Sequence, residues 1–222
     1  SALSHDLRTP LTSLVSLAES LSVAKPSLPE RQLMTAGAIR DQALRLCGLV
    51  EKLLNMARLH AGKVKLRKEW QPLEEVIGAS IKLLDRSLAE HPLRVDLPPD
   101  LPVLEFDAVL IERVFCNLLE NAAKYAPVGS AIEIAARQNG DRVAISVSDH
   151  GSGIPQARQK TIFDMFVRGA TESPLPGVGL GLAICRAIVE AHGGEIGVSN
   201  RAEGGACFVF SLPIGEPPVI EE

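Results

Sequence analysis

A regular apolar repeat between residues 36 and 57 is the feature that most limits how this chain can fold. Apolar residues recur there at alternating spacings of three and four, a heptad pattern that predicts a helix packed against another helix. The repeat consists of Ala36, Ile39, Ala43, Leu46, Val50, Leu53 and Ala57. A second helical repeat covers residues 3–21, and we expect Pro10 to kink it. With a turn at residues 25–29 between them, the two stretches predict an antiparallel helical hairpin.

This hairpin has too little inner surface to be stable by itself. Two copies that pair would bury both apolar seams in a four-helix bundle, so we expect a homodimer. The alternative is that the hairpin packs only against the rest of its own chain. Because four residues precede His5, we expect the bundle to be shortened and the dimer to be weaker than in a longer parent protein.

The chain alternates between strand and helix patterns after Ala61 and Gly62, which end the second helix. Two pairs of alternating apolar segments predict β-hairpins, and an Asn-Gly-Asp turn joins the first pair. The expected strands are 64–70, 94–97, 131–136, 142–149, 195–200 and 206–212, and the expected helices are 73–91, 107–125 (with Asp107 as N-cap) and 180–192. We therefore predict a helical domain at residues 1–61 and an α/β two-layer sandwich with a mixed sheet at residues 62–222.

Composition removes several classes of function. The net charge of −4 and the pI near 5.8 give no reason to expect nucleic acid or an anionic membrane as a partner. The four cysteines show no C-x-x-C spacing, so a zinc site is not expected. No apolar run of about 18 residues is present, and we expect this part of the protein to be soluble and to make no membrane contact.

Residues 4–10, Ser-His-Asp-Leu-Arg-Thr-Pro, place a histidine beside a carboxylate. If the stretch is helical, His5 shares one face with Arg8 and Thr9, while Asp6 lies about 100° away. Taken alone, the segment is a weak signal, because most histidines on polar helix faces simply contact solvent. Its interpretation depends on the second half of the chain.

A polar stripe on the expected helix 107–125 is the first of four stretches suited to nucleotide binding. Asn117, Glu120, Asn121 and Lys124 fall on one face of that helix. Amide oxygens suit a hard cation such as Mg²⁺ that also binds waters and nucleotide phosphates, and Lys124 offers a charge to a phosphate. A solvated helix face is the alternative.

The second stretch follows the expected strand 142–149. Asp149 is followed by Gly151 and Gly153, so its carboxylate could accept a hydrogen bond from an exocyclic amine while the backbone approaches a flat ring. An ordinary Asp-x-Gly turn explains the same letters.

The remaining two stretches lie on either side of a polar loop at residues 169–176. Phe163 and Phe166 precede it and could anchor it, although both are also compatible with a simple core role. Three alternate glycines follow it and open a helix, where bare N–H groups and the helix N-terminus suit an anion. These glycines are Gly177, Gly179 and Gly181. Their spacing matches neither a Walker A loop nor the dinucleotide fingerprint.

In order and spacing, these stretches together resemble the catalytic core of the sensor histidine kinases of bacterial two-component systems. The family's H, N, G1, F and G2 boxes match residues 5–10, 117–125, 149–153, 163–166 and 177–181. Three flanking segments are similar to the kinases that control potassium uptake; they are residues 68–70, 176–189 and 200–208. The resemblance implies a dimerisation and histidine-phosphotransfer domain at residues 1–61 and a GHKL, or Bergerat-type, ATP-binding domain at residues 62–222.

The resemblance also implies the phosphotransfer chemistry. His5 would accept the γ-phosphoryl group of ATP, with Asp6 as general base, and pass it to an aspartate of a cognate response regulator. Thr9 matches the position that orients water for phosphatase activity toward that regulator, and Arg168 would contact the γ-phosphate. The implied location is cytoplasmic, as part of an inner-membrane sensor.

The nucleotide site is implied in the same way. Asn121 would ligate Mg²⁺ through the nucleotide, with support from Asn117. The residues implied to bind ATP are Asn117, Asn121, Lys124, Tyr125, Asp149, Gly151, Gly153, Phe163, Phe166, Gly177, Gly179, Leu180 and Gly181.

Two positions depart from related patterns. Hydrolytic GHKL proteins carry a water-activating glutamate where this chain has Asn117, which favours transfer to His5 over ATP hydrolysis. His150 stands where the family more often has a small or amide residue, and we expect it to be a tolerated variation. The competing hypotheses are a GHKL ATPase whose hairpin only oligomerises, and a catalytically silent dimeric scaffold.

Overall fold

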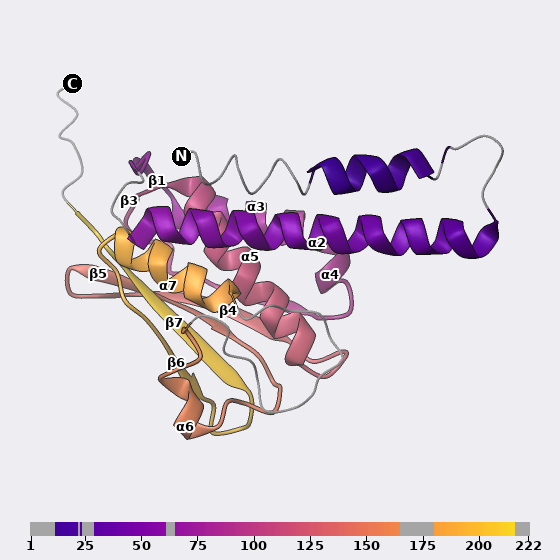
Figure 1. The fold of residues 1–222 in the computed structure, drawn as a ribbon. Helices are drawn as coiled ribbons and strands as arrows, with labels where there is room; N and C mark the ends of the chain where they lie inside the picture. Colours follow the sequence, from indigo (N-terminus) through magenta and orange to yellow (C-terminus); the bar gives the residue numbers. More distant parts are fainter. Residues whose placement is uncertain (1–11, 22, 24–28, 61–64, 165–179, 216–222) are drawn as a thin grey trace. The chain divides into compact units, whose positions relative to one another are not determined.

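The computed structural model describes residues 12–21, 23, 29–60, 65–164 and 180–215. The chain divides into two compact units, residues 1–58 and 59–222. In the first unit, residues 12–21 form a helix, and α2 (Glu30–His60) returns alongside it (Figure 1). The predicted antiparallel helical hairpin is confirmed. The expected kink at Pro10 and residues 25–28 of the expected turn lie outside the described residues.

The apolar repeat of α2 is only partly buried. Ala36 and Ala43 are buried, whereas Ile39 and Leu46 of the same repeat are 46% and 47% exposed. The predicted pairing of two hairpins requires apolar side chains that are exposed in one copy and can be buried by the second. The larger side chains of this seam meet that requirement. None of the described helices combines the length and the apolar character needed to cross a membrane.

A five-stranded sheet in the order β2-β4-β5-β7-β6 forms the centre of the second unit. Its strands are β2 (Leu93–Asp96), β4 (Ile132–Asn139), β5 (Arg142–Ser148), β6 (Ile196–Asn200) and β7 (Ala206–Pro213). β2 runs parallel to β4, and the other neighbours are antiparallel, so the predicted mixed sheet is confirmed. Gly140 in the turn between β4 and β5 has φ +62°, a conformation that glycine adopts without strain.

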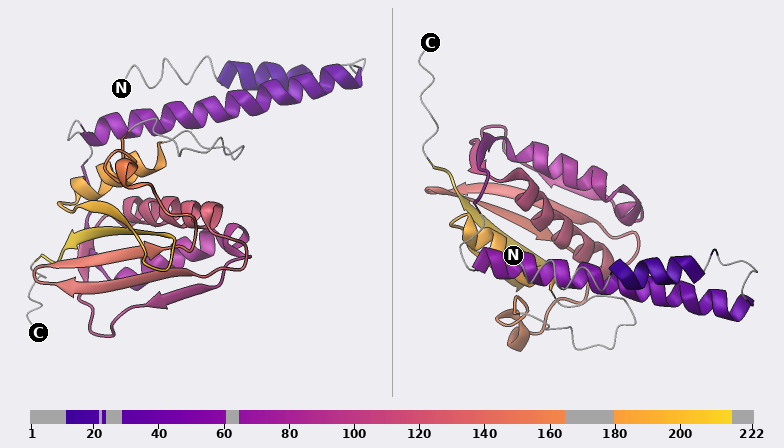
Figure 2. Two further views of the ribbon diagram at one scale, coloured as in Figure 1. Left: turned by 90° about the horizontal axis from the view of Figure 1, so that it is seen from below. Right: turned by 45° about the horizontal axis from the view of Figure 1, so that its top comes forward.

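Helices α3 (Leu73–Leu83), α5 (Ala108–Tyr125) and α7 (Gly181–Ala191) cover one face of this sheet (Figure 2). The buried side chains of α5 recur at helical spacing; they are Ile111, Val114, Phe115, Leu118, Leu119 and Ala122. Phe115 meets Phe210 of β7 edge to face, with ring centroids 5.4 Å apart. The core therefore lies between the helices and the sheet, as predicted for a two-layer sandwich.

Some element boundaries differ from the predictions. The strand expected at residues 64–70 is confined to β1 (Glu69–Gln71), which pairs with the unpredicted strand β3 (Leu104–Phe106). The helix expected at residues 73–91 breaks at Leu84, whose backbone N–H is shared between two carbonyl groups of the preceding turn, and α4 (Asp85–Leu88) follows it. The short helix α6 (Gln156–Gln159) was also unpredicted.

Candidate functional site

The polar stripe of α5 lies beside the start of α7. The predicted N-cap Asp107 is confirmed, because its Oδ1 accepts a hydrogen bond from the Leu110 N–H at 3.2 Å. Asn117 donates from Nδ2 to the Arg113 carbonyl oxygen at 2.9 Å. Its Oδ1 lies against Gly181, where an added Cβ would be 3.2 Å away. Two of the predicted motifs, which are far apart in sequence, therefore meet at this point.

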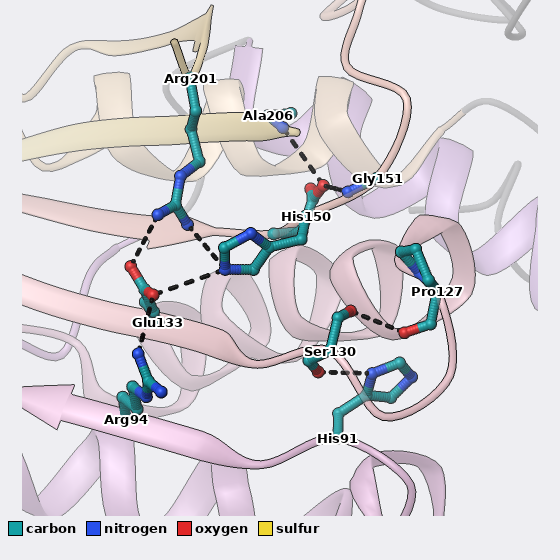
Figure 3. Close-up of polar contacts among 10 residues, drawn as sticks. His91, Arg94, Pro127, Ser130, Glu133, His150, Gly151, Arg201 and Ala206 are labelled. Carbon is teal, nitrogen blue, oxygen red and sulfur yellow. Dashed lines mark hydrogen bonds and ion pairs between the residues drawn. The ribbon is translucent and has the colours of Figure 1, made fainter. Parts of the chain in front are cut away.

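Asp149, 4% exposed, directly follows β5 and is held by the backbone of two segments. Its Oδ1 accepts hydrogen bonds from the N–H groups of Gly151 at 2.7 Å and Ala206 at 3.2 Å. Figure 3 labels these two donor residues. Among the residues that the structure describes, no donor is hydrogen-bonded to its second carboxylate oxygen. One oxygen is thus fixed, and the other can accept a hydrogen bond from a ligand amine.

The glycines after Asp149 are required by close contacts. A Cβ on Gly151 would lie 2.6 Å from the Tyr125 carbonyl oxygen, so the loop packs directly on the end of α5. Gly153 has φ +71°. These contacts bring a third predicted motif against the same helix, α5, and favour the nucleotide interpretation of the loop over an ordinary turn.

Two residues of this site were not predicted to have a role. The Asn200 side chain accepts a hydrogen bond from the Ile154 N–H and donates one to the Ile154 carbonyl oxygen, both at 2.8 Å. Gly205 has φ +99°, and a Cβ there would collide with the Asp149 carbonyl oxygen. β6 and β7 bring both residues to the end of β5, so only the sheet topology relates them to Asp149; the adjacent glycines at 204 and 205 were the one local signal.

The other predicted residues within the described ranges have mixed surroundings. Phe163 is buried and meets Phe208 of β7 edge to face at 6.3 Å, and Leu180 is buried before α7. The Lys124 Nζ lies 5.1 Å from the ring centroid of the half-exposed Tyr125. The remaining candidates lie outside the described residues; they are His5, Asp6, Thr9, Phe166, Arg168, Gly177 and Gly179.

Asn121 is the position where the chain best fits a nucleotide-bound cation. Its half-buried side chain makes no hydrogen bond within the described part of the chain, so its amide oxygen is available to a ligand. An amide oxygen suits Mg²⁺ that retains waters and phosphate oxygens. Across the described ranges, no group of three or more His, Cys, Asp or Glu side chains is placed to hold a metal ion.

The cysteines closest to the stripe are poor nucleophiles. Burial raises the pKa of Cys185, on α7 beside Asn117, to about 12. Burial also raises the pKa of Cys116, and the Glu112 carboxylate adds to that shift. Both thiols are therefore protonated near neutral pH, and their roles are in packing.

Comparisons with known proteins agree with the motifs. The model of the "His Kinase A (phospho-acceptor) domain" matches residues 1–62, and that of the "Histidine kinase-, DNA gyrase B-, and HSP90-like ATPase" matches residues 106–216. The chain is 48% identical over 221 residues to the sensor protein KdpD of Escherichia coli, and the alignment covers 100% of this chain and 25% of that protein. It is 36% identical over 215 residues to KdpD of Clostridium acetobutylicum, and that alignment covers 96% of this chain and 24% of that protein.

A solved structure has a fold similar to that of this chain. Full-length ShkA in complex with AMPPNP has a TM-score of 0.82 and 28% sequence identity, covering 98% of this chain and 46% of that one. The chain spans about a quarter of the length of the two KdpD proteins.

Proposed function

Because this chain belongs to the sensor histidine kinases, we propose that it transfers the γ-phosphoryl group of ATP to His5 and then to an aspartate of a response regulator. The observation that carries the proposal is that two motifs distant in sequence both pack against the motif on α5. Asn117 lies against Gly181, and Tyr125 lies against the loop that follows Asp149. A buried carboxylate with one oxygen held by backbone N–H groups is suited to select the adenine amine.

The nucleotide site is proposed to lie within residues 62–222. Asp149 accepts a hydrogen bond from adenine, Asn121 provides an amide oxygen for nucleotide-bound Mg²⁺, and Asn117 supports it. Lys124 and Tyr125 line the pocket. When bound there, the cation would supply positive charge that offsets the charge on the phosphates. The proposal also gives phosphate-binding roles to Gly177, Gly179 and Arg168, on sequence alone.

The phosphoacceptor is proposed to lie in residues 1–61. A neutral imidazole nitrogen of His5 attacks the γ-phosphorus, the bond to the β-γ bridging oxygen breaks, and ADP leaves. Asp6 acts as general base for the imidazole proton. Since His5 and Asp149 belong to different units, transfer requires the two units to bring His5 to the γ-phosphate.

The 48% identity to KdpD supports a more specific proposal. We place the chain in the cytoplasmic part of an inner-membrane sensor that responds to potassium or osmotic stress and forms a homodimer through its hairpin. Its regulator is KdpE-like, and Thr9 orients water for dephosphorylation of that regulator.

The test is acid-labile ³²P incorporation from labelled ATP. We expect His5→Gln to abolish labelling while ATP binding survives, because the nucleotide site lies in the other unit. His60→Gln, a second histidine of the helical region, is the matched control and should retain labelling. Undiminished labelling of His5→Gln would exclude His5 as the acceptor, and steady phosphate release without a phosphoprotein would indicate an ATPase instead.

A further inference from the structure

We propose that Glu133 is a positioning residue for the nucleotide site, because from the open face of the sheet it links the two loops that hold Asp149. This inference rests on the proposed ATP-binding function. Glu133 lies on β4 between the buried residues Ile132 and Ile134. Side chains alternate along a strand, so Glu133 lies on the face opposite α5 and α7.

Three basic side chains surround the Glu133 carboxylate (Figure 3). Its Oε2 lies 3.1 Å from the Arg201 Nη2, and its Oε1 lies 3.5 Å from the His150 Nε2 and 3.7 Å from the Arg94 Nη1. The Arg201 Nη1 also lies 3.4 Å from the His150 Nε2. The carboxylate is therefore shared by β2, by the loop after β5 and by the turn after β6.

The first of these loops contains Asp149 itself. His150 lies between Asp149 and Gly151, whose N–H donates to the Asp149 carboxylate. The imidazole therefore holds the loop from the open face while the carboxylate of the preceding residue takes part in the site. His150, expected from the sequence to be a tolerated variation, has a specific partner here.

The second loop supplies the other donor to Asp149. Arg201 follows Asn200, the residue whose side chain holds Ile154. The Arg201 N–H donates to the Gly205 carbonyl oxygen at 3.0 Å, which closes the turn immediately before Ala206. Because the Ala206 N–H donates to the Asp149 Oδ1, the position of Arg201 fixes one side of the Asp149 carboxylate.

These side chains are partly exposed and lie outside the core between the sheet and its helices, so we do not expect them to determine whether the unit folds. The side chains of Glu133 and His150 are 31% exposed and that of Arg201 is 19% exposed, and such pairs contribute little to stability. Removing Glu133 leaves three basic groups without their shared acceptor and unlinks the two loops. The expected consequence is a less ordered Asp149, with the sheet intact.

The experiment compares Glu133→Gln with Asp96→Asn. Asp96 pairs with Arg137 across the same two strands and on the same open face, without contact to either Asp149 loop, so it controls for general loss of an ion pair between β2 and β4. We expect Glu133→Gln to raise the Kd for Mg-ATP in titration calorimetry, and the KM for ATP in autophosphorylation, about fivefold with kcat unchanged. Asp96→Asn should leave both constants unchanged.

A double-mutant cycle tests whether Glu133 acts on the nucleotide site through Arg201. Arg201→Gln should weaken ATP binding like Glu133→Gln, and the double variant should be no worse than either single variant. If Glu133→Gln fails to fold, Arg201→Gln serves as the variant that tests the inference. Equal effects of Glu133→Gln and Asp96→Asn, an unchanged Kd, or additive effects in the cycle would overturn the inference. An intact chain that does not bind ATP would instead overturn the proposed function.

Discussion

The two units of the chain differ in the kind of side chain that they bury. In the second unit, large side chains such as Phe106, Phe115 and Phe210 are fully buried. In the first unit, the apolar residues described as buried are Ala18, Ala36 and Ala43. Its exposed large apolar residues are Leu14, Leu17, Leu21, Val23, Met34, Ile39, Leu44 and Leu46. Among the residues that the structure describes, the second unit buries large apolar side chains within one chain, and the first buries only alanines.

This difference has a functional consequence. Residues that hold Asp149 come from strands whose buried faces are already packed, so nucleotide binding should not depend on oligomerisation. The unit that contains the proposed phosphoacceptor leaves Ile39 and Leu46 of its apolar repeat exposed, so phosphotransfer should depend on a second copy. Changes in the two units should therefore give separable defects.

The largest expected effect is the loss of a core aromatic ring in the second unit. Phe210→Ala removes a fully buried ring and its edge-to-face contact with Phe115, which should lower the free energy of unfolding by about 3–5 kcal/mol. The measurement is urea unfolding followed by fluorescence of Trp70, the single tryptophan, which lies on β1 of this unit.

Its counterpart in the first unit is Leu17→Ala. Leu17 is exposed, so Trp70 should report the same unfolding midpoint as in the unchanged chain. A comparable loss of stability in both variants would mean that the two units do not differ in core completeness.

A smaller effect is expected from Gly151→Ala, which acts on the site and leaves the core intact. The new Cβ would lie 2.6 Å from the Tyr125 carbonyl oxygen, so the loop after Asp149 must shift. We expect ATP binding to weaken by about 2 kcal/mol, a factor of about 30, in titration calorimetry. Gly197→Ala is the matched control, because a Cβ there meets nothing within 4 Å. Equal ATP affinity in the two variants would contradict the proposed position of the site.

The next prediction concerns the open seam of the first unit. Ile39→Asp places a charge on the exposed part of the repeat and should raise the dimer dissociation constant by about tenfold or more in sedimentation, because the carboxylate must be desolvated on pairing. ATP binding should be unchanged. Leu44→Asp is the control: Leu44 is also exposed but lies about 140° around α2 from Ile39. A dimer weakened equally by both changes would exclude this seam as the interface.

The elements predicted most accurately from the sequence are those whose bounds are set by neighbouring residues. The helix capped by Asp107 and the strand pairs β4-β5 and β6-β7 were predicted nearly at their observed bounds, because caps, turns and periodicity are local signals. β3 was missed because it has three residues and is stabilised by β1, whose Gln71 pairs with Leu104. No pattern in either segment indicates the other.

The candidate site shows the same division. Asp149, Gly151 and Asn117 were predicted because each belongs to a compact motif. Asn200 and Glu133 were given no role, since each contacts the loop after Asp149 only once β4, β5, β7 and β6 have assembled into one sheet. Contacts of this kind depend on strand register, which the sequence alone left open.

The smallest expected effect is a pH dependence confined to the second unit. His192, 2% exposed, donates from Nδ1 to the Ile188 carbonyl oxygen at 2.8 Å, and its Nε2 accepts the Asp107 N–H at 3.0 Å. It therefore joins the end of α7 to the start of α5 as a neutral imidazole. Burial lowers its pKa, and the hydrogen bond to Ile188 opposes that shift.

Because the unfolded chain then binds a proton at higher pH than the folded one, this contribution to stability is complete above the ordinary histidine pKa of about 6.5 and is lost as pH falls below it. We expect the unfolding free energy reported by Trp70 to decrease from pH 7 toward pH 5, by at most about 1.4 kcal/mol per pH unit for one proton. His192→Gln should remove this slope, and His60→Gln should retain it. An unchanged slope in His192→Gln would show that other groups set the pH dependence, and loss of the slope in His60→Gln would show that the end of α2 contributes to the stability measured at Trp70.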